Sequence, residues 1–380
     1  MQAKSFKASS IGDLENQILL AKSDGYNPTL ALIFSAVGIG LDAIPEVFKK
    51  HGIDLIGCST SGEISNAVCL ENMVVGLLFD LKKEHFRIHA ASTEDKSLYS
   101  CCFEAGKIAG ASFKNPAVLL LSGGVSIDAE QLVYGLRDGV GREIPLFGGQ
   151  AGDNMRLEST FAFSNEVMTN NGIACLILDN DRVEVRGLAT SGWEAIGDVN
   201  VITKAEGNVV YEINHQPALD VFLKYFGFFS NKVDPNNDFS SISAQYPMQI
   251  ERENGIRVLR TPLFVLADEK ALILGGAIRE GEKFRFSISP GFDVIEKTVK
   301  EFGQFAQKVQ DPDAVVLFSC KGRHFALGPL LEEEVEGLYN HWKAPMAGFL
   351  SYGEIGTPDG GICEFHNETC SLVLLKERMN

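Results

Sequence analysis

Gly57-Cys58-Ser59-Thr60-Ser61-Gly62-Glu63 is the first of three similar stretches in this chain. Gly148-Gly149-Gln150-Ala151-Gly152-Asp153 and Gly348-Phe349-Leu350-Ser351-Tyr352-Gly353-Glu354 are the other two. Each follows, by roughly 30 residues, an apolar run that ends in serine, and a helical pattern fills the interval. These runs are Leu30 to Ser35, Ala117 to Ser122 and Ala314 to Ser319. The pattern predicts one strand–helix–strand unit built three times, each ending in a glycine followed by a carboxylate.

The repeat extends beyond these endings. Two pairs of segments are typical of β-hairpins that lead by a helix into the second and third units: 72–80 with 86–91, and 270–276 with 283–289. Residues 72–153 and 270–354 are therefore interpreted as copies of one module, and residues 12–63 as a copy without the hairpin. Strand–helix–strand units give parallel pairs and hairpins add antiparallel strands. The predicted fold class is α/β of mixed α+β type, with mixed sheets in two pseudo-homologous domains.

A domain boundary is expected between Gly187 and Gly207, because Thr190-Ser191-Gly192-Trp193 is polar and turn-like and a new hairpin begins at Val199. We therefore predict domains over residues 12–200 and 201–376. Pro217 is expected to open a helix, and residues 227–240 to form an exposed loop.

Composition narrows the classes of function. The chain has 380 residues, 45% of them hydrophobic and 22% charged, as expected of a globular protein with two domains. The net charge of −16, without any basic run, argues against a nucleic-acid partner. The N-terminus resembles no signal peptide, and no apolar stretch reaches the ~20 residues of a membrane helix. The eight cysteines form no C-x-x-C pair, so we expect reduced thiols and a cytoplasmic location without membrane contact.

The repeated carboxylates are the first candidate site. Ligands bind beyond the carboxyl ends of parallel strands, which is where Glu63, Asp153 and Glu354 are predicted to lie. With Tyr352 they could face one cleft and bind an amine, a cation or a backbone amide. The alternative is structural: the glycine allows a left-handed turn and the acid caps it. The sequence leaves both interpretations open.

A second candidate is Phe318-Ser319-Cys320-Lys321-Gly322-Arg323-His324, which follows a buried strand. Arg323 could hold a ligand carboxylate through two hydrogen bonds, or pair with Glu354. Cys320, beside two cations, could be a reactive thiol or an inert buried one. Cys58 lies in a stretch that only resembles a G-x-S-x-G elbow. Nucleotide-binding loops and catalytic metal motifs are absent, so we expect no enzyme activity.

Four histidines near turns or strand ends could each be an axial haem ligand: His215, His324, His341 and His366. Each of them by itself is better explained as a structural residue, and one of the four is expected to be the ligand.

Several ordered motifs resemble those of the FIST family, sensory proteins with an N-terminal and a C-terminal FIST domain. The resemblance covers nearly the whole chain and rests on these stretches: Gly57 to Ile64, Phe147 to Asp153, Gly207 to Glu212, Pro217-Ala218, Ser319-Cys320-Lys321-Gly322-Arg323, Ala347 to Gly356 and His366-Asn367-Glu368-Thr369.

The resemblance implies an intracellular sensor of a small ligand. FIST domains occur in bacterial signalling proteins near histidine kinases or cyclic-di-GMP enzymes, and amino acids have been suggested as ligands. A subset, NosP, binds haem and senses nitric oxide for a partner kinase, and this chain has the same two-domain layout. The favoured hypothesis is therefore a non-enzymatic sensor that holds haem b and reports nitric oxide to such a kinase or cyclic-di-GMP enzyme.

Two rival functions remain. The first is a haem-free module for a small polar ligand such as an amino acid, with the carboxylates binding its ammonium group and Arg323 its carboxylate. The second is an enzyme or redox switch centred on Cys320 or Cys58.

Overall fold

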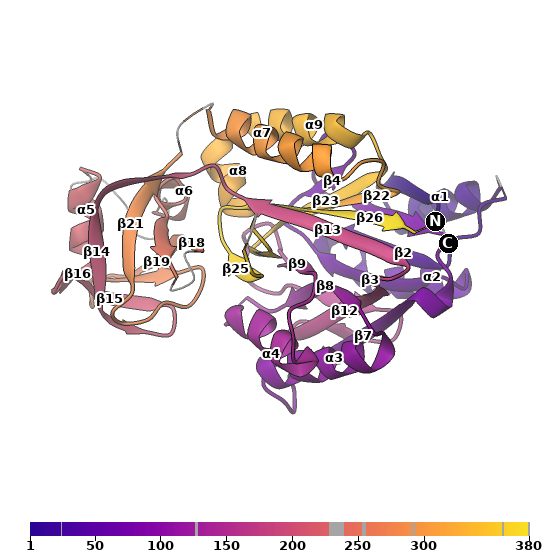
Figure 1. Ribbon diagram of the computed structural model, residues 1–380, viewed down its shortest axis with the longest axis horizontal. Coiled ribbons are helices and arrows are strands. Elements are labelled where there is room, and N and C mark those ends of the chain that lie inside the picture. Colours follow the sequence, from indigo (N-terminus) through magenta and orange to yellow (C-terminus); the bar gives the residue numbers. More distant parts are fainter. Residues whose placement is uncertain are drawn as a thin grey trace.

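The computed structural model describes residues 1–23, 25–125, 128–227, 239–252, 256–289, 291, 293–358 and 361–378. Two parts are visible in Figure 1. The larger part, which we call the body, holds residues 3–190 and 293–377, and the N- and C-termini lie side by side in it. The smaller part, which we call the insert, holds residues 194–288. None of the described helices is both long and apolar enough to cross a membrane.

The body consists of three units with one order of elements. The first holds β1 (Ala3–Ala8), α1 (Ile11–Ser23), β2 (Leu30–Ser35), α2 (Ile44–Lys50), β3 (Asp54–Ser59), β4 (Glu63–Ser65), β5 (Val68–Leu70) and β6 (Val74–Phe79). The second holds β7 (Phe86–Ser92), α3 (Leu98–Ser112), β8 (Pro116–Gly123), α4 (Glu130–Val140), β9 (Leu146–Gln150), β10 (Ala162–Ser164), β11 (Met168–Thr169) and β12 (Gly172–Asp179). The third holds β13 (Val183–Thr190), α7 (Asp293–Lys308), β22 (Ala314–Cys320), α8 (Lys321–Leu327), α9 (Leu330–Trp342), β23 (Met346–Ser351), β24 (Gly353–Gly356), β25 (Glu364–His366) and β26 (Cys370–Glu377). Three short 3-10 helices complete the body: Val37–Ile39, Leu41–Ala43 and Lys83–His85.

The three units exchange strands in a cycle. Their sheets have equivalent orders, β1-β6-β2-β3-β10-β11, β7-β12-β8-β9-β24-β25 and β13-β26-β22-β23-β4-β5. In each sheet the pair from the strand–helix–strand unit is parallel, as predicted. The last two strands of each sheet come from a different unit: β4 pairs with β23, β10 with β3 and β24 with β9. In each case the next strand, β5, β11 or β25, extends the sheet by pairing with this one. The body therefore cannot be divided into parts that are continuous in sequence.

The mixed α+β fold class is confirmed, but the predicted hairpins are wrong. β6 pairs with β1 and β2, whereas β7 pairs with β12, so residues 72–80 and 86–91 lie in different sheets. In the same way β20 (Ala271–Leu274) pairs with β15 and β19, whereas β21 (Lys283–Ile288) pairs with β14 and β17. The alternation of apolar and polar residues identifies a strand but not its partner. A strand pairs where its apolar face is best buried, and the partner can be far away in the sequence.

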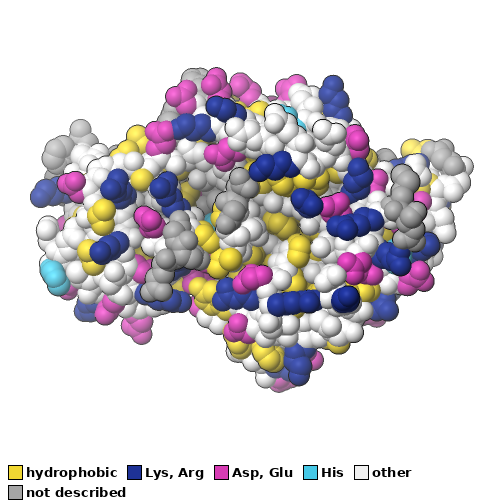
Figure 2. Space-filling model, viewed as in Figure 1, with side chains coloured by type: hydrophobic (Ala, Val, Ile, Leu, Met, Phe, Trp, Pro, Cys, Tyr) yellow, Lys and Arg dark blue, Asp and Glu magenta, His cyan; other side chains and the backbone are white. Residues whose placement is uncertain are grey.

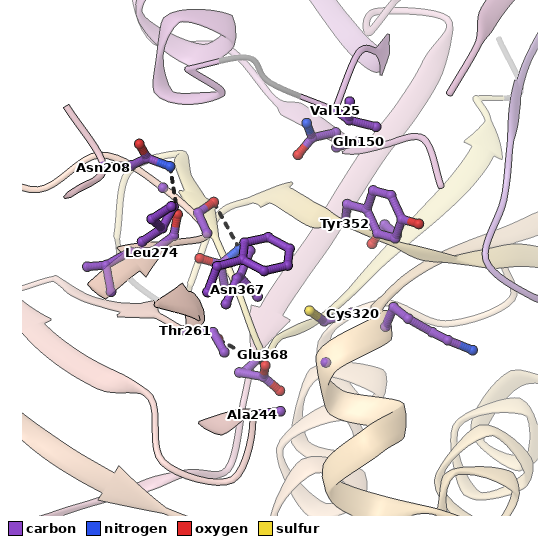
Figure 3. Close-up of a pocket in the computed structure, with 18 of the residues that line it drawn as sticks. Val125, Gln150, Asn208, Ala244, Thr261, Leu274, Cys320, Tyr352, Asn367 and Glu368 are labelled. Carbon is purple, nitrogen blue, oxygen red and sulfur yellow. Dashed lines mark hydrogen bonds between the residues drawn. The ribbon is translucent and has the colours of Figure 1, made fainter. Parts of the chain in front are cut away.

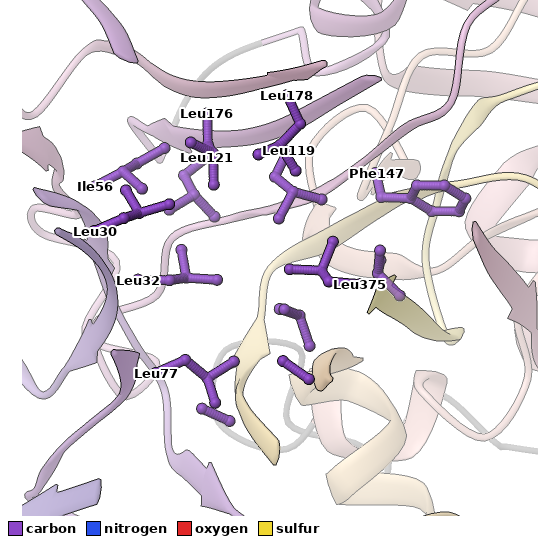
Figure 4. Packing of buried hydrophobic residues seen from close by; sticks show 14 of the residues in the cluster. Leu30, Leu32, Ile56, Leu77, Leu119, Leu121, Phe147, Leu176, Leu178 and Leu375 are labelled. Atoms are coloured by element: carbon purple, nitrogen blue, oxygen red, sulfur yellow. The ribbon is translucent and has the colours of Figure 1, made fainter. Parts of the chain in front are cut away.

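The three sheets enclose one central core. Buried side chains of β2, β8, β22 and their neighbours meet there, and Figure 4 shows leucines of all three units pointing toward one another. The rings of Phe34, Phe318 and Phe349 pack at its middle, with centroids 4.8 to 6.3 Å apart. The helices α7 and α9 cover the third sheet, and α3 and α4 the second (Figure 1).

The insert interrupts the third unit between β13 and α7. It is built on an antiparallel sheet, β18-β17-β21-β14-β15-β20-β19, with β16 beside β15. Its further elements are β14 (Glu194–Glu206), β15 (Val209–Ile213), β16 (Gln216–Pro217), α5 (Ala218–Tyr225), α6 (Phe239–Ser243), β17 (Met248–Glu251), β18 (Arg257–Arg260) and β19 (Pro262–Leu266). The hairpin expected near Val199 and the helix after Pro217 are present as β14–β15 and α5. The predicted domain boundary at residue 200 lies inside β14, and most of the predicted loop 227–240 lies outside the described residues.

Candidate functional site

Two of the three repeated carboxylates are buried anchors where the chain crosses from one sheet to the next. Glu63 accepts hydrogen bonds from the Thr60 hydroxyl and, at 3.0 Å, from the backbone amide of Met73. Glu354 accepts equivalent bonds from Ser351, at 2.6 Å, and from Thr369. Burial raises the pKa of Glu63 to about 7 and that of Glu354 to about 8, which favours the neutral acids. Both carboxylates hold the turns from which they come.

Asp153, the third carboxylate, joins two of the repeated corners. It accepts backbone hydrogen bonds from Leu157, Glu158 and Ser159 and a further bond from the phenol of Tyr352. Burial alone would raise its pKa, but these donors hold the pKa of Asp153 below its usual value. The fold therefore brings Asp153 and Tyr352 together, as predicted, but the two side chains are hydrogen-bonded to each other.

Arg323 has a structural environment. Its guanidinium is fully buried and pairs with Glu334 of α9 through Nε, at 2.8 Å, and Nη2. The remaining N–H groups donate to the Ser191 and Glu368 carbonyls and to the Thr298 hydroxyl. All five donors are thus used, and no N–H group is left for a ligand carboxylate. The partner is Glu334, not the Glu354 that the structural alternative had suggested.

A cavity of about 680 Å³ lies between the insert and the body. The body contributes residues at or just after the ends of β8, β9, β22 and β23. The insert contributes the residue after α6, the turn between β14 and β15, and residues of β19, β20 and the turn after β20. Figure 2 shows hydrophobic side chains in the middle of the face, at the hollow between the two parts. Its volume lies within the range of about 300–1,000 Å³ that is usual for small-molecule sites.

The polar wall of this cavity comes from the segment before β26 (Figure 3). Glu368 is fully buried, and its Oε1 accepts a hydrogen bond from Thr261 of the insert at 2.9 Å. The neighbouring Asn367 donates to the Gly275 carbonyl of the insert at 3.4 Å. Burial raises the pKa of Glu368 to about 8, and the nearby Glu354 adds to this effect. Body and insert are thus joined at the cavity by two polar side chains.

Among the predicted site residues, Tyr352 and Cys320 line the cavity. Glu63, Asp153, Glu354 and Arg323 do not line it, and neither does Cys58. The thiols of Cys320 and Cys58 are buried, and burial raises the pKa of each well above its usual value. A lowered thiol pKa, which the redox hypothesis needs, is therefore not supported by their surroundings.

The four candidate histidines do not converge on the cavity. His366 is buried with Nε2 facing the Gly356 carbonyl at 3.3 Å, and His341 Nε2 faces the Val299 carbonyl at 2.9 Å. His324 Nδ1 lies 3.1 Å from Lys321 Nζ, and His215 is exposed in the turn before β16. No histidine lines the cavity, and no group of three metal-ligating side chains occurs among the described residues. The residues of this cavity therefore do not fit a haem with a histidine ligand.

Sequence reasoning missed Asn367 and Glu368, the residues of the polar wall. Both residues stand in the motif His366-Asn367-Glu368-Thr369, but only its histidine is of a residue type that predicts a haem ligand. The insert's contributors, such as Thr261 and Asn208, carry no local signal, because they matter only where the two parts meet.

Comparison with known proteins agrees with this architecture. The FIST N domain matches residues 29–216 and the FIST C domain matches residues 218–357. An uncharacterized protein of Methanocaldococcus jannaschii, MJ1623, is 26% identical to this chain, and the alignment covers 88% of this chain and 71% of the relative. The two domain matches together span most of the sequence. The chain therefore belongs to the FIST family of sensory, small-ligand domains.

Proposed function

We propose that this protein is a haem-free sensor that binds a small polar ligand in the cavity between the insert and the body. The observation that carries the proposal is that this cavity is walled by two parts of the chain that are joined to each other through cavity residues, Thr261 to Glu368 and Gly275 to Asn367. A ligand in such a place contacts both parts and changes the free energy of their association.

The output of the sensor follows from the same arrangement. Ligand binding would favour one position of the insert against the body, and a signalling partner would recognise the surface that this position presents. A cytoplasmic histidine kinase or cyclic-di-GMP enzyme is the class of partner that we propose, by analogy with the family. An amino acid belongs to the ligand class, although Arg323 would not bind its carboxylate.

Haem and nitric oxide sensing are the less favoured ligand hypothesis. Haem sensing would need an axial ligand at the cavity, and each of the four candidate histidines lies elsewhere with other neighbours. A redox switch at Cys320 or Cys58 is less favoured because both thiols are buried with raised pKa values.

The proposal is tested by thermal unfolding and calorimetric titration of the full chain with amino acids, amines and haemin. Ala277→Phe places a ring in the cavity, whereas Ala267→Phe makes the same change at an exposed turn of the insert. A true ligand at 100 times its Kd stabilises the wild type by about 2.7 kcal/mol. We expect this stabilisation in Ala267→Phe and its loss in Ala277→Phe. Equal responses of both variants, or a stoichiometric Soret band with haemin, would contradict the proposal.

A further inference from the structure

The segment between β9 and β10 presents Met155 and Leu157 to the cavity in an unusual backbone conformation. Asn154, Met155 and Leu157 have φ angles of 61°, 61° and 55°, in the left-handed region. The amide of Arg156 donates to the Asp153 carbonyl at 3.4 Å and closes a tight turn over Asn154 and Met155. Asparagine and glycine are usual at such positions, whereas the side chain of a methionine or leucine makes this conformation sterically unfavourable. Two bulky apolar residues are therefore held in strained backbone at the cavity wall.

Hydrogen bonds from the surrounding structure hold this conformation in place. The amide of Met155 donates to the phenolic oxygen of Tyr352 at 2.7 Å, and the amide of Leu157 donates to Oδ1 of Asp153 at 3.0 Å. Strained backbone persists only where its neighbours impose it, and it is concentrated at ligand clamps and active sites. The strain of this segment therefore points to a binding role for the side chains that it presents.

The same cavity gathers exposed apolar side chains from both parts of the molecule. Nine large hydrophobic side chains are exposed among the described residues, and three of them line this cavity. They are Val125, 37% exposed, just after β8; Phe264, 42% exposed, on β19 of the insert; and Phe325, 37% exposed, on α8. Met155 and Leu157, both half-buried, add to this surface. Exposed apolar side chains that come from separate elements and meet at one cavity are typical of a ligand site.

The polar part of a ligand has donors available on both sides of the cavity. In Figure 3, Gln150 of the body and Asn208 of the insert lie on different sides. Each side-chain amide uses one N–H group in a contact at 2.9 Å, with the carbonyl of Gly124 or of Leu274, and keeps a second. Such groups bind carboxylates, amides and hydroxyls alike, so the apolar surface is the more selective feature of the wall.

We propose that the polar ligand carries an apolar body of the size of an aromatic ring, and that Met155 and Leu157 form the clamp that holds this body. The inference rests on the proposed function of the same cavity and names the class of its ligand. A compact polar molecule would leave most of the 680 Å³ of the cavity to water in contact with apolar side chains. A clamp whose backbone is already fixed loses little conformational freedom when the ligand binds.

Four probes separate the apolar body from the head group: propionate, 3-phenylpropionate, L-alanine and L-phenylalanine. Within each pair, the two probes differ only in one phenyl ring on C3. Calorimetric titration of the full chain should give at least about tenfold tighter binding for the ring-bearing probe of each pair, or about 1.4 kcal/mol. Met155→Ala and Leu157→Ala should each weaken the binding of the ring-bearing probes at least about threefold.

Leu20→Ala is the matched control. Leu20 is exposed on α1 and does not line the cavity, so this variant should bind all four probes like wild type. Failure of both ring-bearing probes to bind, equal binding within the pairs, or an unchanged affinity in both Met155→Ala and Leu157→Ala would overturn the proposal.

Leu157→Gly tests the strained backbone without any ligand. Leu157→Gly and Leu157→Ala both remove the side chain, but only glycine adopts a φ of 55° without steric cost. Leu157→Gly should therefore have the higher Tm. A Tm at or below that of Leu157→Ala would show that the backbone is not strained and would overturn the clamp.

The outcomes also separate this proposal from the sensory function. If a ligand of another kind still loses its effect in Ala277→Phe, the sensory function stands without the apolar clamp. If no ligand does, both proposals fail.

Discussion

Tyr352 donates its phenolic hydrogen to Asp153, which lies 199 residues earlier in the chain. The same oxygen accepts hydrogen bonds from the backbone amides of Asp153, at 3.2 Å, and Met155, at 2.7 Å. The side chain of Tyr352 lines the cavity, as does Met155. One hydroxyl group therefore ties the third unit to the second and fixes the cavity wall between them.

Tyr352→Phe should lower the free energy of unfolding by about 1–3 kcal/mol, because it leaves the partly buried amides of Asp153 and Met155 without an acceptor. Chemical denaturation measures the loss. Tyr99→Phe is the control, since Tyr99 makes a similar bond to Asp138 at 2.9 Å on the surface and its removal should change little. Equal stability of the two variants would contradict the structural role of Tyr352.

Arg323→Lys should destabilise the fold by about 3 kcal/mol or more, because a lysine cannot satisfy Glu334, Thr298 and two carbonyls at once. Denaturation midpoints would show this loss. Arg186→Lys, at an exposed pair with Glu184, is the matched control and should behave like wild type. If Arg323→Lys kept full stability but lost ligand binding, the ligand-binding role expected from the sequence would be restored.

Glu130→Gln should loosen the insert from the body. Glu130 begins α4 and pairs with two arginines of the insert, Arg252 and the fully buried Arg260. Breaking buried pairs of this kind costs about 3–5 kcal/mol, which should appear as faster amide hydrogen exchange in β18 and β25. Asp138→Asn, on the same helix but exposed, should exchange like wild type. Unchanged protection in Glu130→Gln would show that other contacts hold the insert.

The free energy of unfolding should fall as the pH rises from about 4.5 to 8. Burial raises the pKa values of Glu354 and Glu368 to about 8 from an ordinary 4.5, so the folded protein keeps protons that the unfolded chain releases in this range. Each group contributes a slope of up to about 1.4 kcal/mol per pH unit. Denaturation at a series of pH values should give a shallower slope for Glu368→Gln than for wild type or for Glu336→Gln, which alters an exposed glutamate. Identical slopes would mean that Glu368 is ionised in the folded state.

Cys320 and Cys58 should resist alkylation by iodoacetamide in the folded protein at pH 8. Their burial raises the thiol pKa and blocks access, and the thiolate is the reactive form. Peptide mass spectrometry before and after denaturation measures the difference. Rapid labelling of Cys320 in the native state would revive the redox hypothesis.

Much of the local structure could be predicted. The three apolar runs form β2, β8 and β22, and the helical patterns between strands are present as α2, α4 and α9. These features depend on the periodicity of residues close in sequence, which a single chain displays directly. The role of Arg323 could not be read in the same way, because its partners Glu334 and Thr298 come from two other helices.

The sequence by itself determined the threefold repeat, the strand–helix–strand pairs, the mixed fold class and the family. Only the tertiary structure decided that β4, β10 and β24 each leave their own unit, as when Ile64 pairs with Gly348. It also decided that the insert closes over the segment of Asn367 and Glu368 to make a cavity. The physical reason is that each strand can pair with any free edge, and each apolar face can pack on any other face, of the folded chain. Residues far apart in sequence therefore form a site that no single segment encodes.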